Sequence, residues 1–270
     1  MKFKKKCPIC GFDNFTQKFT YNKKPRGETK FEINYKNYFR YYLSCNSCGH
    51  WFSKNNLIPK NIYSSNYNKY TYSKNIKKNF LKIIKLPKKK SDNYFRLKRI
   101  KDFINKYKKK KKIELLDVGS GLGVFPYSIK NAGWNCTALD PDIISVRHIK
   151  NKLKIKCIHG DFIKKSIAKR FDIVTFNKVL EHVKNPLKML KKAKKNLNKN
   201  GIAYLEVPDA EAASKHGKER EEFFIDHMHV FTKKSLELLS IKSKFELIKI
   251  DRTVEPSGKF TIFAFVKRKN

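Results

Sequence analysis

Short apolar runs alternate with amphipathic stretches from residue 113 to the end of the chain. Such runs are typical of strands buried in a parallel sheet, and the amphipathic stretches between them indicate crossover helices. We expect strands at 113–118, 134–139, 155–159, 171–176, 201–207, 245–251 and 259–266. Helices are expected at 125–132, 143–153, 186–197 and 233–240. Pro186 lies in the first turn of the third of these helices, and Thr232 is the N-cap of the fourth. The pattern predicts an α/β fold.

The pattern differs before residue 113, and the difference divides the chain into three regions. Residues 1–55 contain two cysteine pairs and many aromatic residues, which we interpret as a small ribbon module. Residues 56–112 are rich in Lys, Asn and Tyr and form a connecting segment, in which 82–112 supplies one or two helices that cover the sheet edge. Residues 113–270 form the α/β domain.

Charge and hydropathy limit the possible partners and the location of the protein but do not identify its function. The formal net charge of +40 suits a nucleic acid or an anionic surface as partner. Only 9 of the 63 basic residues are Arg, and the lysines are spread over almost every segment, so solvated lysines encoded by an AT-rich genome are the competing interpretation. No run approaches the roughly 20 apolar residues of a membrane span, and no apolar segment follows the basic start. We therefore expect a cytoplasmic protein.

A glycine-rich turn, Asp117–Gly123, follows the first predicted strand. Gly119, Gly121 and Gly123 permit the tight turn and let a ligand lie against the backbone. Their spacing differs from the Gly-x-Gly-x-x-Gly of dinucleotide sites. The Asp117 carboxylate is also unsuited to a pyrophosphate, whereas it suits the ammonium and sulfonium groups of S-adenosylmethionine. The turn therefore predicts a site for S-adenosylmethionine.

Polar residues follow the next strands in the order that such a site requires. Asp140 stands 23 residues after Asp117, where a carboxylate can accept hydrogen bonds from both ribose hydroxyls. Asp161 can accept from the adenine amino group, while Phe162 packs near the ring. Asn177 ends the fourth predicted strand, whose following loop should border the point of methyl transfer.

With these motifs, residues 113–207 resemble the class I S-adenosylmethionine-dependent methyltransferases, especially the small-molecule branch that carries the segment Val179–Val183. Seven strands that end in a hairpin, with the last strand inserted antiparallel, are the order of that fold. The resemblance implies a seven-stranded Rossmann-like sheet and an enzyme that transfers a methyl group. It also implies cofactor contacts from Gly119, Gly121, Asp140, Asp161 and Asn177.

Two Cys-x-x-Cys-Gly knuckles separated by 34 residues lie in the N-terminal module. Their four thiolates predict a closed, tetrahedral structural zinc site made by Cys7, Cys10, Cys45 and Cys48. A site filled by four cysteines needs no fifth ligand, so we expect His50 on the surface. The module resembles the N-terminal zinc-binding segment of methyltransferases in sugar and surface-polysaccharide pathways, and we interpret the Tyr-rich stretch 63–72 as a substrate lid.

The loop after the fifth predicted strand contains the candidate acceptor residues. Its Asp-His-Met-His segment resembles the loop of the sugar-methyltransferase-like branch, where histidines and an acid face the acceptor. Because imidazole accepts protons near neutral pH, His227 and His229 are the candidate bases, with Glu222 as a secondary contact to acceptor hydroxyls. Three alternatives remain: the histidines cap a helix or bond carbonyls, His182 belongs to the pocket, or Asp226, His227 and His229 hold a metal.

The predicted function is methylation of a small molecule, namely a sugar, nucleotide-sugar or glycan intermediate. The alternatives are an RNA or protein methyltransferase that uses the basic surface, and a non-catalytic zinc-ribbon protein that binds nucleic acid. The absence of an Asn-Pro-Pro-Tyr-type motif after the fourth strand disfavours the first alternative, and the cofactor motifs disfavour the second. Sugar C-methyltransferases of this layout carry a further C-terminal domain, whereas this sequence ends at Asn270, so O- or N-methylation is expected at least as much as C-methylation.

Overall fold

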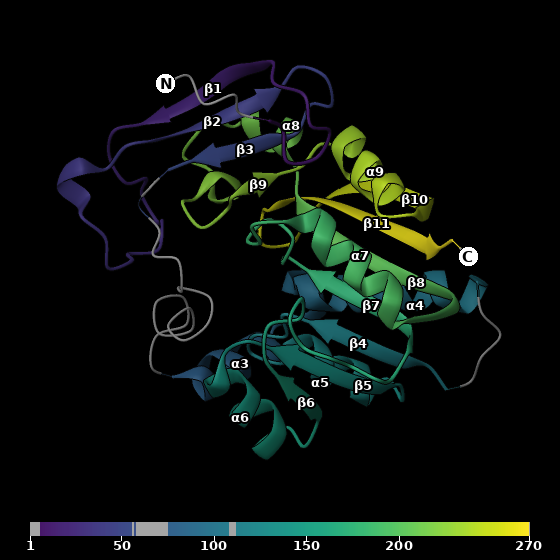
Figure 1. Cartoon of the computed structure of the whole chain (residues 1–270). Coiled ribbons are helices and arrows are strands. Elements are labelled where there is room, and N and C mark those ends of the chain that lie inside the picture. The colour runs from purple at the N-terminus through teal and green to yellow at the C-terminus, as the bar shows by residue number, and fades with distance from the viewer. Residues whose placement is uncertain (1–5, 56, 58–74, 108–111, 270) are drawn as a thin grey trace.

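Two sheets organise the computed structural model, which describes residues 6–55, 57, 75–107 and 112–269 (Figure 1). The larger sheet has the strand order β10-β11-β8-β7-β4-β5-β6. Its parallel strands are β4 (Glu114–Val118), β5 (Asn135–Asp140), β6 (Lys156–His159), β7 (Phe171–Asn177) and β8 (Leu197–Pro208). The hairpin of β10 (Phe245–Val254) and β11 (Phe260–Arg268) completes it, with β11 antiparallel to β8. The predicted seven-stranded fold is confirmed.

Helices cover both faces of this sheet. On one face, α4 (Asp92–Tyr107) and α5 (Val124–Asn131) bury Ile100, Ile104 and Ile129 against β4, β7, β8 and β11. On the other face lie α7 (Pro186–Asn196) and α9 (Lys233–Lys242). The helices α3 (Ile76–Ile84) and α6 (Ile143–Asn151) pack together near β5 and β6. The expectation that the segment before β4 covers the sheet edge is wrong for α4, because its isoleucines are buried on a face.

The predicted helix starts agree with the structure. Thr232 caps α9, since its side-chain oxygen accepts a hydrogen bond from the Ser235 amide at 3.1 Å. Pro186 occupies the first turn of α7, where the missing amide hydrogen costs no intrahelical bond. Among the described helices, none combines the length and apolarity that crossing a bilayer requires.

The smaller sheet contains β1 (Phe15–Tyr21), β2 (Arg40–Cys45) and β3 (Trp51–Lys54) from the N-terminal module. Its fourth strand, β9 (His229–Val230), comes from the loop between β8 and α9 and pairs with Trp51 and Phe52. Short elements complete the described chain: η1 (Tyr35–Asn37), η2 (Lys88–Lys90), α8 (Ala210–Ser214) and η3 (Glu221–Phe223). The module at 1–55 therefore shares a sheet with the loop that the sequence marks for the acceptor, and the domain boundaries stay a prediction. The predicted lid at 63–72 lies outside the described residues.

Candidate active site

A cleft of about 2090 Å³ lies between the carboxyl ends of the central parallel strands and the smaller sheet. The strand ends contribute Gly119 after β4, Asp140 from β5 and Asn177 from β7, and the smaller sheet contributes Tyr41 and Phe52. Ligands of open α/β sheets bind at this edge, where the chain turns from strand to helix. The cleft is large enough for two ligands side by side.

The glycine-rich turn divides into two glycines that face the cleft and one that serves packing. Gly119, Gly121 and Gly123 all have positive φ, at 74°, 50° and 75°. Gly119 and Gly121 line the cleft. A Cβ atom on Gly123 instead comes within 2.7 Å of the Leu153 Cδ1 atom and 2.8 Å of the Ile149 Cγ1 atom. Gly123 therefore lets α5 begin close to α6, and its predicted cofactor contact stays a prediction.

The structure brings Asp140, Asp161 and Phe162 together along the cleft wall. The Asp140 carboxylate accepts hydrogen bonds from the Gly121 and Asp142 amides, both at 2.8 Å, which tie the end of β5 to the glycine-rich turn. Burial raises the pKa of Asp140 to about 6. Each carboxylate oxygen can accept a further hydrogen bond. The Phe162 ring is buried and provides an apolar wall.

Asp117 and Asn177 form a pair at the ends of β4 and β7. The Asp117 Oδ1 atom accepts from the Thr175 hydroxyl at 2.7 Å and from the Asn177 amide nitrogen at 2.8 Å. Burial raises the pKa of Asp117 to about 6. Asp117 does not line the cleft, whereas Asn177 does. The Oδ1 atom of Asn177 is buried without a hydrogen-bond partner. A cationic ligand group at this end of the cleft would satisfy that acceptor.

His227 lines the cleft with a fixed ring orientation. Its Nδ1 atom lies 2.9 Å from the Glu222 carbonyl oxygen, so Nδ1 carries the hydrogen and the neutral ring keeps a lone pair on Nε2. The Glu222 carboxylate is itself occupied by Arg220, which donates from Nε at 3.0 Å and from Nη2 at 2.8 Å, and by the Phe260 amide at 2.7 Å. The predicted acceptor contact of Glu222 stays a prediction, although its contacts are those of a loop anchor.

His229 is bound at both ring nitrogens. Its Nε2 atom lies 3.0 Å from the Val183 carbonyl oxygen and therefore donates to it, while Nδ1 accepts from the Nε2 atom of His50 at 3.0 Å. Burial lowers the pKa of His229 to about 4. The expectation that His50 lies on the surface is wrong: its exposed fraction is 0%, because the β3–β9 pairing places it beside His229. Among the described residues, Asp226, His227 and His229 do not form a potential metal-binding group; His227 groups instead with Glu181 and His182.

Two residues of the turn after β7 join His227 in the cleft. His182 lies with its ring centroid 4.8 Å from that of His227, and its Nδ1 atom is 3.0 Å from the Asp226 carbonyl oxygen. Glu181 is fully buried, and its carboxylate has no hydrogen-bond partner. The sequence pointed to His182 only as an alternative and to Glu181 only as part of a family segment, because nothing in the local pattern shows which side chains meet across the turn.

The N-terminal module holds the acceptor loop through a buried network. Arg40 donates to the Phe223 carbonyl oxygen and to the Glu28 carboxylate, both at 2.8 Å. Glu28 also accepts from the Ile225 amide at 2.7 Å, and the Tyr42 hydroxyl donates to the His227 carbonyl oxygen at 2.6 Å. The module is thus a scaffold that orients the loop.

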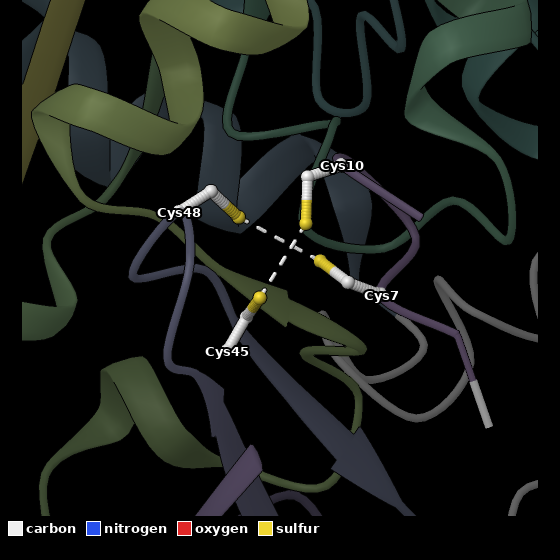
Figure 2. Close-up of side chains that lie close together, drawn as sticks. All are labelled: Cys7, Cys10, Cys45 and Cys48. Atoms are coloured by element: carbon white, nitrogen blue, oxygen red, sulfur yellow. Dashed lines mark hydrogen bonds between the residues drawn. The ribbon is translucent and has the colours of Figure 1, made fainter. Parts of the chain in front are cut away.

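The four knuckle cysteines converge on one point (Figure 2). Their sulfur atoms all lie within 4.8 Å of one another, with 3.7 Å between Cys7 and Cys48 and 3.4 Å between Cys10 and Cys45. Zinc–sulfur bonds of about 2.3 Å in a tetrahedron place the sulfurs roughly 3.8 Å apart. The geometry fits a tetrahedral metal.

Comparisons with known proteins agree with this architecture. The model of a family described as "Methyltransferase domain" matches residues 93–250. The chain is 29% identical over 99 residues to a ubiquinone biosynthesis O-methyltransferase of Rickettsia typhi (strain ATCC VR-144 / Wilmington), a match that covers 35% of this chain and 40% of that relative. The chain thus spans less than half the length of this curated relative.

Two solved structures share the fold. Magnesium protoporphyrin IX methyltransferase from Synechocystis PCC 6803, with bound SAH, superposes with a TM-score of 0.60 at 11% identity, over 78% of this chain and 100% of that one. The glycopeptide N-methyltransferase MtfA, complexed with S-adenosyl-L-methionine, gives 0.52 at 13% identity, over 63% and 93%. The model of the methyltransferase domain family matches residues 93–250, which are more than half of this chain. The chain therefore belongs to the methyltransferase domain family.

Proposed function

We propose that the chain transfers a methyl group from S-adenosylmethionine to an oxygen or nitrogen atom of a small-molecule acceptor. One observation carries the proposal: a single cleft is lined by Gly119 and Gly121 of the glycine-rich turn and by His227 of the loop before α9. The family match and the shared fold support the same activity.

The residues of the nucleoside end fit this cofactor. Asp140 would accept hydrogen bonds from the ribose hydroxyls, and the buried, unpartnered Asn177 Oδ1 atom would accept from the ammonium group. Asp161 and Phe162 would flank the adenine. The cofactor supplies an electrophilic methyl group on a sulfonium. The chain's part is to hold the acceptor atom in line with that methyl group and to exclude water.

His227 is the proton acceptor in this proposal. Its Nδ1 hydrogen is held by the Glu222 carbonyl, so the Nε2 lone pair is the one available to an acceptor hydroxyl or ammonium. His229 is less suited, because both of its ring nitrogens are already bound.

A sugar, nucleotide-sugar or glycan intermediate suits the acceptor end. The wall formed by the N-terminal module combines the aromatic rings of Phe39, Tyr41 and Phe52 with the amides of Asn37 and Asn55. Aromatic faces suit the C–H faces of a saturated ring, and side-chain amides suit its hydroxyls. A structural zinc ion on the four cysteines would hold the knuckles of this wall together.

The test is methyl transfer from labelled S-adenosylmethionine to a panel of sugars, nucleotide-sugars and glycan fragments, with phenolic acceptors as the comparison. Wild type should label a member of the first group, and His227→Ala should lower kcat by about 10²-fold or more. His216→Ala is the matched control, because His216 is exposed and outside the cleft. Full turnover by His227→Ala would refute the base, and labelling of phenols alone would refute the acceptor class.

A further inference from the structure

The Glu181 carboxyl group is an unexplained feature of the cleft. Its side chain is 0% exposed, and neither carboxylate oxygen has a hydrogen-bond partner, although Glu181 lines the cleft. A buried carboxylate without a donor costs several kcal/mol, so it calls for a cation or a proton. The backbone fixes its position, since the Glu181 carbonyl oxygen accepts from the amides of Met228 at 2.8 Å and His229 at 3.1 Å.

Two histidines lie beside this carboxylate with their rings oriented by backbone carbonyls. The Nδ1 atoms of His182 and His227 donate to the carbonyl oxygens of Asp226 and Glu222, at 3.0 and 2.9 Å. A hydrogen bond of this kind directs Nε2 as the ligand atom in metal-binding histidines. One potential ligand atom from each of Glu181, His182 and His227 lies within 4.8 Å of the other two.

We propose that Glu181, His182 and His227 hold a divalent first-row transition-metal ion in the cleft. Two imidazoles and one carboxylate are a facial ligand set that leaves the remaining positions open; the imidazoles suit Fe²⁺ and Zn²⁺, and the carboxylate also suits Mn²⁺. Bonds of about 2.1 Å place neighbouring ligand atoms roughly 3.0–3.4 Å apart, so ligand atoms that now lie up to 4.8 Å apart would move closer by up to about 1.4–1.8 Å around the ion. The ion also compensates the buried Glu181 charge.

This site adds a metal ion to the proposed function. Metal binding itself does not depend on the proposed function, whereas the role of the ion in methyl transfer rests on it. Because Glu181, His182 and His227 all line the cleft, an acceptor hydroxyl in the cleft could bind at an open position of the ion, and its pKa would then fall. Its proton would pass to water, and the oxygen would attack the methyl carbon as the carbon–sulfur bond breaks. In that state His227 is a ligand and acts through the ion. Metal dependence of turnover separates this role from that of a simple base.

Metal binding can be measured without the reaction. The full chain is loaded with one equivalent of zinc, which the four thiolates take in preference to the trio, and is then titrated with Mn²⁺, with free Mn²⁺ followed by electron paramagnetic resonance. Mn²⁺ is the probe because thiolates disfavour it, so it does not report on the cysteine cluster. We expect one Mn²⁺ per wild-type chain and binding at least about tenfold weaker in Glu181→Gln and His227→Ala. His216→Ala should bind as wild type.

The outcomes distinguish the two proposals. Absence of Mn²⁺ binding in wild type, or equal binding by Glu181→Gln, overturns the metal site and leaves Glu181 as a protonated carboxyl group. Methyl transfer that continues at full rate in a chelator, with zinc retained on the cysteines, overturns the metal's role in the reaction. Normal Mn²⁺ binding with no transfer to any acceptor leaves the metal site standing and overturns the proposed function.

Discussion

Replacing Arg40 with Met tests whether the N-terminal module anchors the acceptor loop. Arg40 is 0% exposed, pairs with Glu28 at 2.8 Å and donates to the Phe223 carbonyl oxygen at 2.8 Å. Methionine keeps much of the buried volume but leaves the Glu28 carboxylate buried without its cation. Breaking a buried pair in this way lowers the free energy of unfolding by about 3–5 kcal/mol. The same change should speed hydrogen exchange at the Ile225 amide, which donates to Glu28.

Urea unfolding of wild type, Arg40→Met, Glu28→Gln and the double variant gives the assay. In the double variant no uncompensated charge is left, so its loss should be smaller than the sum of the two single losses. A loss within about 0.5 kcal/mol for Arg40→Met, or strict additivity in the cycle, would refute the reasoning.

Three further predictions concern a histidine, two glycines and the cysteine cluster. The pKa of His229 is about 4 in the folded chain and about 6.5 when unfolded, so the unfolded state takes up the proton first. Relative to His229→Gln, whose remaining groups titrate alike, the free energy of unfolding of wild type should fall by up to about 3 kcal/mol as pH drops from 6.5 to 4, and a difference between the two that stays constant over this range would contradict it. Gly123→Ala should lower the melting temperature more than Gly133→Ala, because both have positive φ but only Gly123 meets side chains within 3 Å; equal losses would exclude the packing argument. Cys45→Ser should release zinc and increase exchange at the His229 amide, as measured by metal analysis and mass spectrometry, and retention of a full equivalent of zinc would count against the site.

The larger sheet was predictable because each of its elements is encoded locally. Apolar runs fall on the strands, Thr232 and Pro186 mark helix starts, and the glycine-rich turn has the positive φ angles that its residues permit. Boundaries differ most at β8, which begins at Leu197 and not at residue 201, because its first residues pair with β7 before the apolar run starts.

The acceptor end was predictable only in part, because its contacts join residues far apart in the chain. The two-residue strand β9 exists only because β3 pairs with it, and that pairing buries His50 against His229. Nothing near His50 in the sequence indicates its partner, since the two residues are separated by 179 positions. Glu181 was missed for the same reason: its burial depends on the loop that lies over it.

Binding of S-adenosylmethionine tests the central claim most directly. Isothermal titration of the full chain should show one cofactor per chain, and Asp140→Ala should bind at least about tenfold more weakly, because it removes charge-assisted hydrogen bonds to the ribose. Asp251→Ala, an exposed change on β10, should bind as wild type. No binding by wild type, or equal affinity for Asp140→Ala that remains folded, would contradict the assignment of this cleft to the cofactor.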